Sequence, residues 1–328
     1  MRKIFTQLFP SFLGFLLLSL AVSCGGNKNV EPQSNGDELS GRASLSGAFA
    51  LYPLAVKWAE DFQKIHPNVR IDVEGGGAGK GMTDALAGQV DFGMVSREVS
   101  EAEIAKGALG FPVAKDAVVP TINEANPFYE ELVKHGISQA QATDIWINGA
   151  IKTWGQLLGT ADETAISVFT RSDACGAAET WAKWLGKHQE DLLGEGVNSD
   201  PGVANAVQKN INSIGLNNIG YAYDNNTHKP LPGIRVLPVD ANANGQIDPD
   251  EDFYATKDLL TKAIADGKYP SPPARDLYLV SNGIPTNPVA VAFLKYVLTE
   301  GQNANEGVGY ITIPQEKLDA AIQRLESK

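Results

Sequence analysis

The sharpest chemical pattern in the sequence is a run of twelve residues, 240–251, rich in oxygen-bearing side chains. An EF-hand calcium loop places oxygen ligands at positions 1, 3, 5, 7, 9 and 12, with a glycine at position 6 for the tight turn. Gly245 stands at the sixth position of this run. The ligand positions hold Asp240, Asn242, Asn244, Gln246 through its carbonyl, Asp248 and Glu251. The pattern predicts a Ca2+ site, and the alternative is an Asx-rich turn without metal.

The segments beside this loop indicate which kind of calcium site to expect. The preceding run, 232–238, contains Pro232 and Pro238 and therefore does not form a long helix. After the loop, Leu259 and Ile264 favour an exiting helix. Since there is no helix pair to splay apart, we expect a structural calcium clamp rather than a sensor.

A second pattern occurs three times and combines a strand-like run, a loop of small residues and a helical pattern. The first N–H groups of a helix have no acceptor inside the helix, and the helix dipole adds positive character there. Small residues let a ligand approach these donors, so three converging loops would form an anion cradle. Taken alone, each loop is more simply an ordinary strand-to-helix turn. The expected backbone donors are Ala48, Phe49, Ala50, Gly77, Ala78, Gly79, Lys80, Cys175, Gly176 and Ala177.

Polar side chains near the ends of the predicted strands could complete this cradle. Lys80 lies in the second loop, Ser96 and Arg97 follow the apolar strand 90–95, and Arg171 opens the third loop. A guanidinium group donates two parallel hydrogen bonds to an oxyanion. Each cation alone is more often a solvated surface charge. Their shared position at strand ends, the usual ligand edge of an open α/β sheet, favours a site.

Length and composition limit the kind of protein that carries these patterns. The 328 residues, 43% hydrophobic and 20% charged, suffice for one large domain or two lobes. The 27 Lys and Arg residues against 39 Asp and Glu give a formal charge of -12. Such a chain is a poor nucleic-acid binder, so an anion must be met by local donors. Only the N-terminal stretch is apolar enough to enter a membrane, which excludes a polytopic membrane protein.

Residues 1–23 have the pattern of an export signal, with a basic start, an apolar segment at 8–20 and small residues directly before Cys24. This ending resembles the lipobox of bacterial lipoproteins, which implies cleavage before Cys24 and acylation of its thiol. The alternative is a short N-terminal anchor helix. The polar segment 24–40 is then a flexible tether. With Cys24 lipidated, Cys175 has no partner and no internal disulfide forms.

In order and spacing, these segments resemble the phosphate-binding proteins of Pst-type ABC importers. The resemblance covers nearly all of residues 43–315 and includes three C-terminal runs. It implies an α/β, two-lobed periplasmic-binding-protein fold of type II, in which each lobe is a mixed sheet flanked by helices. It also implies a monomer outside the cytoplasm that closes on phosphate and passes it to ABC permease subunits. The segments that carry it are Gly47–Trp58, Gly75–Gly81, Val90–Gly93 with Ser96 and Arg97, Arg171–Asp173 with Gly176, Arg275–Val280, Ala292–Leu294 and Gly307–Tyr310.

Most of the hydroxyl groups that this family offers to phosphate are replaced here. Only one of the hydroxyls that the family places at the site has an obvious counterpart in this chain, and that counterpart is Ser96. A hydrogen bond to a charged group contributes about 1.5–3 kcal/mol, so backbone amides, Arg97, Arg171 and Lys80 must replace the lost donors. We expect phosphate as the ligand, with another small anion or a less polar solute as the alternative. The replaced positions are Ala48, Phe49, Ala50, Ala78, Cys175 and Ala177.

Asp173 and Cys175 each allow two interpretations. Asp173 is expected to cap the third helix with Arg171 as its ion partner. The resemblance implies a second role, in which an acidic group accepts a hydrogen bond from protonated phosphate and repels fully ionised oxyanions. A cysteine at a helix start can be a nucleophile, but no motif links Cys175 to any of the four histidines. We therefore expect no catalysis and a small residue where the family has serine.

Binding proteins of this kind cross between their lobes twice. The first crossing is expected near residues 120–123 and the return near 230–238. Lobe one would then combine 41–120 with 236–328, and lobe two would be 121–235. A calcium-stabilised surface scaffold or adhesion protein that kept the fold without binding phosphate is the alternative function, and an enzyme using Cys175 is a third.

Overall fold

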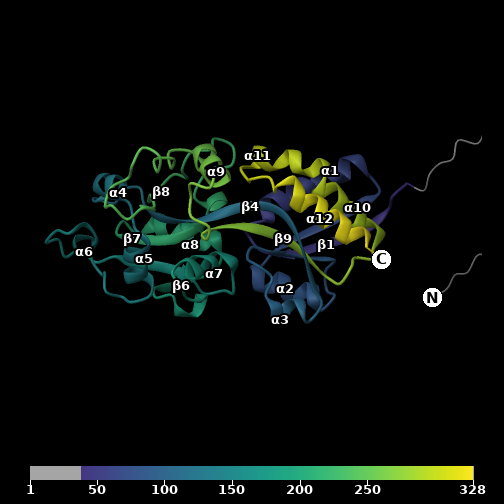
Figure 1. The fold of residues 1–328 in the computed structure, drawn as a ribbon, viewed down its shortest axis with the longest axis horizontal. Helices are drawn as coiled ribbons and strands as arrows, with labels where there is room; N and C mark the ends of the chain where they lie inside the picture. Colours follow the sequence, from purple (N-terminus) through teal and green to yellow (C-terminus); the bar gives the residue numbers. More distant parts are fainter. Residues whose placement is uncertain (1–37, 328) are drawn as a thin grey trace, which may run out of the picture. The chain divides into compact units, whose positions relative to one another are not determined.

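The computed structural model describes residues 38–327, in which strands and helices alternate along the chain (Figure 1). The first part contains β1 (Gly41–Gly47), α1 (Tyr52–Ile65), β2 (Val69–Gly75), α2 (Ala78–Leu86), β3 (Phe92–Val95), α3 (Glu101–Ile104) and β4 (Ala108–Asn123). The middle part contains α4 (Tyr129–His135), α5 (Gln139–Trp146), α6 (Trp154–Leu158), β5 (Ser167–Arg171), α7 (Gly176–Trp184), η1 (Gln189–Asp191), β6 (Glu195–Val197), α8 (Asp200–Lys209), β7 (Ser213–Asn218), η2 (Ile219–Tyr221) and β8 (Ile234–Val236). The last part contains α9 (Lys257–Ala265), β9 (Ala274–Asn282), α10 (Pro288–Leu298), η3 (Glu300–Ala304), α11 (Asn305–Val308) and α12 (Gln315–Glu326). None of the helices in this described part of the chain has the length and apolar character needed to cross a bilayer.

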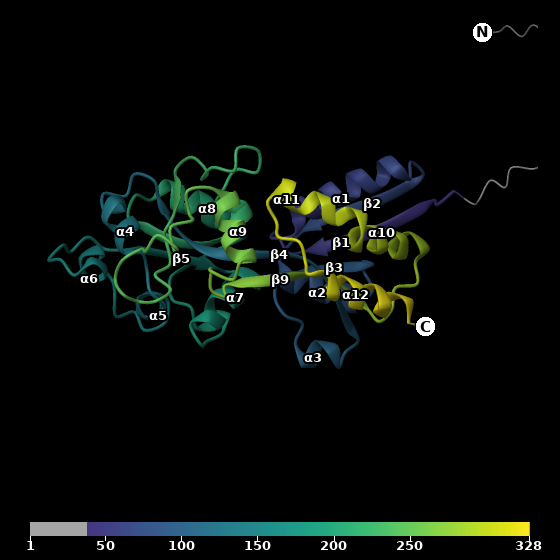
Figure 2. The ribbon, with the colours of Figure 1, turned by 45° about the horizontal axis from the view of Figure 1, so that its top comes forward.

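Within residues 38–327, nine strands join in the order β2-β1-β3-β9-β4-β7-β5-β6, with β8 paired to β4. β1 is parallel to β2 and β3, and β5 is parallel to β6 and β7. The loops that follow β1, β2 and β3 therefore leave the same edge of the sheet. The long strands β4 and β9 are antiparallel neighbours and run between the two ends of this sheet (Figure 2).

Two large hydrophobic cores divide the described residues into two lobes, and a smaller third core around Val203 and Val207 lies within the second lobe. Lobe one is built on buried side chains from Ala43 to Ala114 and from Leu277 to Leu325. Lobe two is built on those from Ala117 to Ala274. Along β4 the core changes between Ala114 and Ala117, and along β9 it changes between Ala274 and Leu277. These two strands are the crossings between the lobes.

The expected return to lobe one near residue 236 is therefore wrong. The segment that follows β8 stays in lobe two, because its apolar side chains bury in the second core. Leu237, Tyr254 and Leu260 all belong to that core, and the Tyr254 hydroxyl accepts a hydrogen bond from the amide of Val239 at 3.0 Å. The proline-rich run suggested a linker, but burial rather than proline content decides the lobe. The first crossing also lies a few residues before the expected 120–123.

Local sequence explains how the site-forming elements begin. α1 carries a proline in its first turn and buries Leu54, Trp58 and Phe62 on one face. The strand before it ends at Gly47, whose φ is +128° and whose absent Cβ would lie 2.4 Å from the Met94 carbonyl oxygen. A larger residue does not fit there. The small residue at 47 thus lets β1 and β3 place their C-terminal loops against each other.

Candidate anion-binding site

The three small-residue loops identified in the sequence meet where the two lobes face each other. The amide of Gly79 in lobe one donates to the carbonyl of Ala174 in lobe two at 3.1 Å. The hydroxyl of Tyr221 in lobe two donates to the carbonyl of Phe49 in lobe one at 3.1 Å. Gly176 is pressed against Ser96, since a Cβ there would lie 2.2 Å from the Ser96 carbonyl oxygen. The predicted convergence of helix starts is present in this structure.

Several of the expected backbone donors are already engaged within the protein. Hydrogen bonds link the amide of Ala48 to the Met94 carbonyl at 2.8 Å and the amide of Gly77 to the Gly47 carbonyl at 3.0 Å. The amide of Cys175 donates to Oε1 of Gln189 at 3.0 Å. Together with Gly79, these four amides do not offer a free donor to a ligand.

The other expected donors are available. The hydroxyl of Tyr221 donates to the carbonyl of Phe49, and the hydroxyl of Tyr310 donates to the carbonyl of Ala50 at 2.7 Å. These bonds hold Phe49 and Ala50 through their carbonyl oxygens and leave the N–H groups of both residues unused. Amides at the helix starts have no intrahelical acceptor. Among residues 38–327, no hydrogen bond is donated by the amides of Phe49, Ala50, Ala78, Lys80, Gly176 and Ala177.

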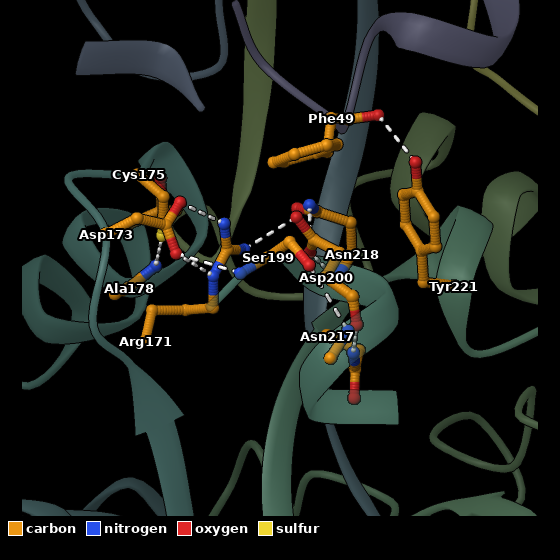
Figure 3. Close-up of polar contacts among 12 residues, drawn as sticks. Phe49, Arg171, Asp173, Cys175, Ala178, Ser199, Asp200, Asn217, Asn218 and Tyr221 are labelled. Carbon is orange, nitrogen blue, oxygen red and sulfur yellow. Dashed lines mark hydrogen bonds and ion pairs between the residues drawn. The ribbon is translucent and has the colours of Figure 1, made fainter. Parts of the chain in front are cut away.

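Arg171 is the cation at the centre of this arrangement (Figure 3). Its Nε and Nη2 donate to Asp173 at 2.8 and 2.6 Å, and its Nη1 donates to Asp200 at 2.6 Å. Arg171 is 5% exposed, and its Cζ lies 6.0 Å from the centre of the Phe49 ring. Burial alone would lower the pKa of Arg171, but the adjacent carboxylates outweigh it and raise that pKa. The group therefore stays charged.

Asp173 is an ion partner rather than a helix cap. The α7 cap is Cys175, whose Sγ accepts from the amide of Ala178 at 3.4 Å. Asp173 instead pairs with Arg171 and accepts from the amide of Ser199 at 3.0 Å. Burial would raise the pKa of Asp173, but hydrogen bonds from Arg171 and Ser199 hold it below its ordinary value. The expected capping role is wrong, and the expected pairing with Arg171 is present.

The other two predicted cations pair with carboxylates of lobe one, away from Asp173 and Asp200. The two terminal guanidinium nitrogens of Arg97, Nη1 and Nη2, donate to Glu103 at 2.9 and 2.7 Å. Burial would raise the pKa of Glu103, but the bonds from Arg97 and Ser100 lower it to about 2. The ammonium group of Lys80 is half-exposed and pairs with Asp84 at 2.6 Å. Both cations are therefore neutralised by partners on their own lobe.

Cys175 lies in the site but lacks the features of a nucleophile. The residue is 6% exposed, and burial raises the pKa of its thiol to about 11. None of its hydrogen bonds within residues 38–327 involves a histidine. At neutral pH the thiol therefore keeps its proton, and the side chain acts as a small cap.

The sequence reasoning missed Asp200, the second carboxylate on Arg171. Asp200 begins α8 directly after Ser199, the N-cap, whose hydroxyl accepts from Gly202 at 3.4 Å. The signal that could have found it is the run Ser199-Asp200-Pro201, which is typical of a helix start. β6 is parallel to β5, so the loop after it reaches the same sheet edge as Arg171.

A cavity of about 1090 Å³ lies between the lobes beside these loops. Gly79, Ala174 and Cys175 line it on the side of the loops, and Arg275 and Tyr278 line it on β9. Its walls carry cations and carboxylates in similar number. The cavity beside the candidate site is therefore lined by charges of both signs.

The loop 240–251 forms a compact turn in lobe two. Asp240 accepts from the amides of Asn244 and Gly245 at 3.2 and 2.9 Å, and Glu251 accepts from the amide of Ala241 at 2.9 Å. Gly245 has a φ of +83°, as the sixth position requires. The loop is joined to α4 by a hydrogen bond of 2.8 Å from the Ile247 amide to the Lys134 carbonyl.

The donor set of this loop suits a hard cation. Asp240 and Glu251 are 3% and 7% exposed, and within residues 38–327 neither forms an ion pair with a lysine or arginine. Buried charges are normally paired or bound to a metal. The expected exiting helix does not follow directly, because α9 begins only at Lys257. Among residues 38–327, however, no group of three or more His, Cys, Asp and Glu side chains is placed to hold a metal ion, so calcium binding at this turn stays a prediction from the spacing of the loop.

Two lobes joined by crossing strands, with helix starts meeting between them, define the class of two-lobed solute-binding proteins. In such proteins the ligand lies between the lobes. The PBP superfamily domain matches residues 32–300, so the chain belongs to the PBP superfamily.

Comparison with known proteins points to phosphate-binding relatives. The chain is 24% identical over 298 residues to the phosphate-binding protein PstS of Staphylococcus haemolyticus, which covers 89% of this chain and 87% of the relative. A substrate-binding protein structure from Clostridium perfringens that contains bound phosphate matches with a TM-score of 0.68 at 21% identity, over 84% of this chain and 100% of that one. An ABC-type phosphate transport receptor from Vibrio cholerae matches with a TM-score of 0.59 at 21% identity, over 83% and 100%. The structural matches agree with the predicted two-lobed fold.

Proposed function

We propose that this protein binds phosphate or a related small oxyanion between its lobes, as the substrate-binding component of an ABC importer. The observation that carries the proposal is the buried Arg171 together with unbonded amides from both lobes, at Phe49 and Ala50 in the turn before α1 and at Gly176 and Ala177 where α7 begins. Helix starts and guanidinium groups are the donors that oxyanions prefer. The named relatives, which bind phosphate, support the same ligand.

The charges around Arg171 favour a protonated oxyanion. Asp173 and Asp200 together carry one more negative charge than Arg171 supplies. This excess negative charge would repel a fully ionised anion, whereas the hydroxyl of hydrogen phosphate can donate a hydrogen bond to a carboxylate. Asp173, half-buried at the edge of the pair, is the residue we propose as that acceptor.

A thermal-shift panel of phosphate, sulfate, arsenate, molybdate and small organic acids, with calcium held fixed, tests this function. Phosphate or arsenate should raise the melting temperature more than sulfate at the same concentration. If no anion raises it while calcium does, the protein is better described as a calcium-stabilised scaffold or adhesion protein that kept the fold. Turnover blocked by a thiol reagent would instead favour an enzyme, against our proposal of no catalysis.

We further propose that the loop 240–251 binds Ca2+ as a structural clamp in lobe two. The two buried carboxylates without a cationic partner and the EF-hand spacing support this. Bound calcium would tie β8 and the end of α4 to the segment that leads into α9. Terbium luminescence, with displacement by calcium, measures binding at this loop. No signal above that of a Glu251→Gln variant would contradict the proposal.

We also propose export and lipid attachment at Cys24, with the membrane contacted only through that lipid. Residues 1–23, Cys24 and most of the tether lie outside the described residues, so the support is the sequence pattern alone. Mass spectrometry of the N-terminal peptide from the native host decides the matter. Acyl groups on Cys24 would support the proposal, and an unmodified peptide that includes residues 1–23 would contradict it.

We propose a monomer with an ABC permease as its protein partner.

A further inference from the structure

A continuous set of buried polar contacts leads away from Arg171. Asp200 receives Arg171 on Oδ2 at 2.6 Å and the side-chain amide of Asn218 on Oδ1 at 2.5 Å. The side-chain oxygen of Asn218, Oδ1, accepts from Nη2 of Arg275. Arg275 in turn donates to Asp116 through Nε at 2.9 Å. One set of contacts thus joins two guanidinium groups through a carboxylate and an amide.

The far end of this set lies on the two strands that connect the lobes. Asp116 on β4 and Arg275 on β9 are direct cross-strand partners. Both lie between the residues at which the strands change from one core to the other. Asn218 pairs with Val118 on β4 in the same way. Rotation of one lobe against the other must therefore bend the backbone beside Asp116 and Arg275.

Burial makes these contacts interdependent. The exposed fractions are 2% for Asp200 and Asn218, 8% for Arg275 and 1% for Asp116. In so dry an environment a charge that loses its partner is costly, so neighbouring members must respond together. A ligand that draws Arg171 away from Asp200 leaves Asn218 as the remaining side-chain partner of the Asp200 carboxylate. The hydrogen bond between the Asn218 side chain and Arg275 should change as a result.

We infer that Asp200 and Asn218 are positioning residues that couple Arg171 to the Asp116–Arg275 pair at the lobe crossing. The inference rests on the proposed function for its ligand, since an anion on Arg171 is the natural input. The coupling itself is a property of the ligand-free protein as well. Occupancy or loss of Arg171 should therefore change the opening of the crossing strands, and Asn218 should be required for that change.

Amide hydrogen exchange at residues 114–118 and 274–278 in purified protein tests the coupling without ligand. Arg171→Ala should accelerate exchange there about fivefold in the wild-type background. In an Asn218→Ala background the same change should have less than about a twofold effect. Asn217→Ala is the matched control, because Asn217 is its neighbour on β7 and binds the main-chain oxygen of Asp200 at 3.2 Å, not the carboxylate. The Arg171→Ala effect should persist in that background.

Equal acceleration with and without Asn218, or none in either background, would overturn the inference. Acceleration of the same size in α5, far along lobe two, would show general destabilisation and would overturn it too. Should Arg171→Ala fail to fold, Arg171→Lys removes the contact geometry with the charge retained and is read in the same way.

A second arm with saturating inorganic phosphate separates this inference from the proposed function. Phosphate should slow exchange at the crossing in wild type and do so less in Asn218→Ala, even where calorimetry shows that site to be filled. A merely structural role for Asn218 would lower the melting temperature and leave that protection intact, which would contradict the coupling. If wild type binds neither phosphate nor another small oxyanion, the proposed function fails, and the ligand-free arm still decides the coupling.

Discussion

The loops 171–177 and 240–251 lie in the same lobe but treat charge in opposite ways. In the first, two carboxylates surround a buried guanidinium while the amides of Gly176 and Ala177 stay free. In the second, backbone amides are consumed by Asp240 and Glu251, and no cationic side chain among the described residues pairs with these carboxylates. The comparison teaches that an acidic chain can present hydrogen-bond donors at one loop and oxygen acceptors at another, as the two proposed ion sites require. The sign of the ion at each proposed site depends on whether backbone N–H groups or side-chain oxygens are left without a partner.

The largest expected effect comes from removing the guanidinium group of the loop 171–177. Arg171→Ala should weaken phosphate binding at least about a hundredfold, because two charge-assisted hydrogen bonds are lost. Arg97→Ala is the matched control, a second arginine at a strand end that pairs with Glu103 and not with the carboxylates around Arg171, and it should change the affinity less than about threefold. Calorimetric titration measures both. Equal losses in the two variants would remove the distinction between them.

The next largest effect should come from the calcium loop. Wild type at a hundredfold excess over the dissociation constant should gain about 2.7 kcal/mol from calcium, or about 5 °C or more in melting temperature. Glu251→Gln should abolish most of this gain. Asp252→Asn, an exposed neighbour outside the ligand positions, should keep it. A calcium response that survives Glu251→Gln would place the metal elsewhere.

Lys257, on the helix after the calcium loop, extends the comparison to a buried cation with neutral partners. Its Nζ donates to Asn225 at 2.7 Å and to the Val308 carbonyl of lobe one at 2.8 Å. Burial lowers the pKa of Lys257 to about 8, whereas an unfolded lysine keeps its proton up to about pH 10.4. Between these values the unfolded state holds more protons, so this group raises the free energy of unfolding as the pH rises.

Lys257→Met should remove about 2–3 kcal/mol of that pH-dependent gain between pH 8 and 10.4. Urea unfolding at pH 7.5 and 10 measures the gain in each variant. Lys262→Met, an exposed position on the same helix, is the control and should leave it unchanged. Identical pH dependence in wild type and Lys257→Met would show that Lys257 does not lose its proton in this range.

The smallest expected effect comes from restoring one hydroxyl to the loop 171–177. Cys175→Ser keeps the cap on Ala178 and adds a better donor, so phosphate should bind about threefold to tenfold more tightly. The wild-type thiol should react slowly with iodoacetamide at pH 7.5, because its pKa is raised to about 11. Weaker phosphate binding by Cys175→Ser would mean that this position does not face the ligand.

Sequence reasoning succeeded where information was local or repeated. Small residues between strands and helices predicted the meeting of helix starts, and the twelve-residue spacing picked out a turn whose backbone matches it at Gly245. It failed where burial decides. Arg97 and Arg171 both lie at the C-terminal ends of strands, yet only tertiary packing places Asp200 beside Arg171 and Glu103 beside Arg97. The predicted lobe boundary was wrong for the same reason, because the residues after β8 still bury in the core of lobe two and the local sequence does not indicate this.

The most direct test of the central claim follows backbone amides by ¹H–¹⁵N NMR during a phosphate titration. The account predicts large downfield proton shifts at Phe49, Ala50, Ala78, Gly176 and Ala177, with smaller changes at the engaged amides of Ala48 and Cys175. Phosphate binding that leaves those five amides unmoved, or that moves only remote surface residues, would contradict it.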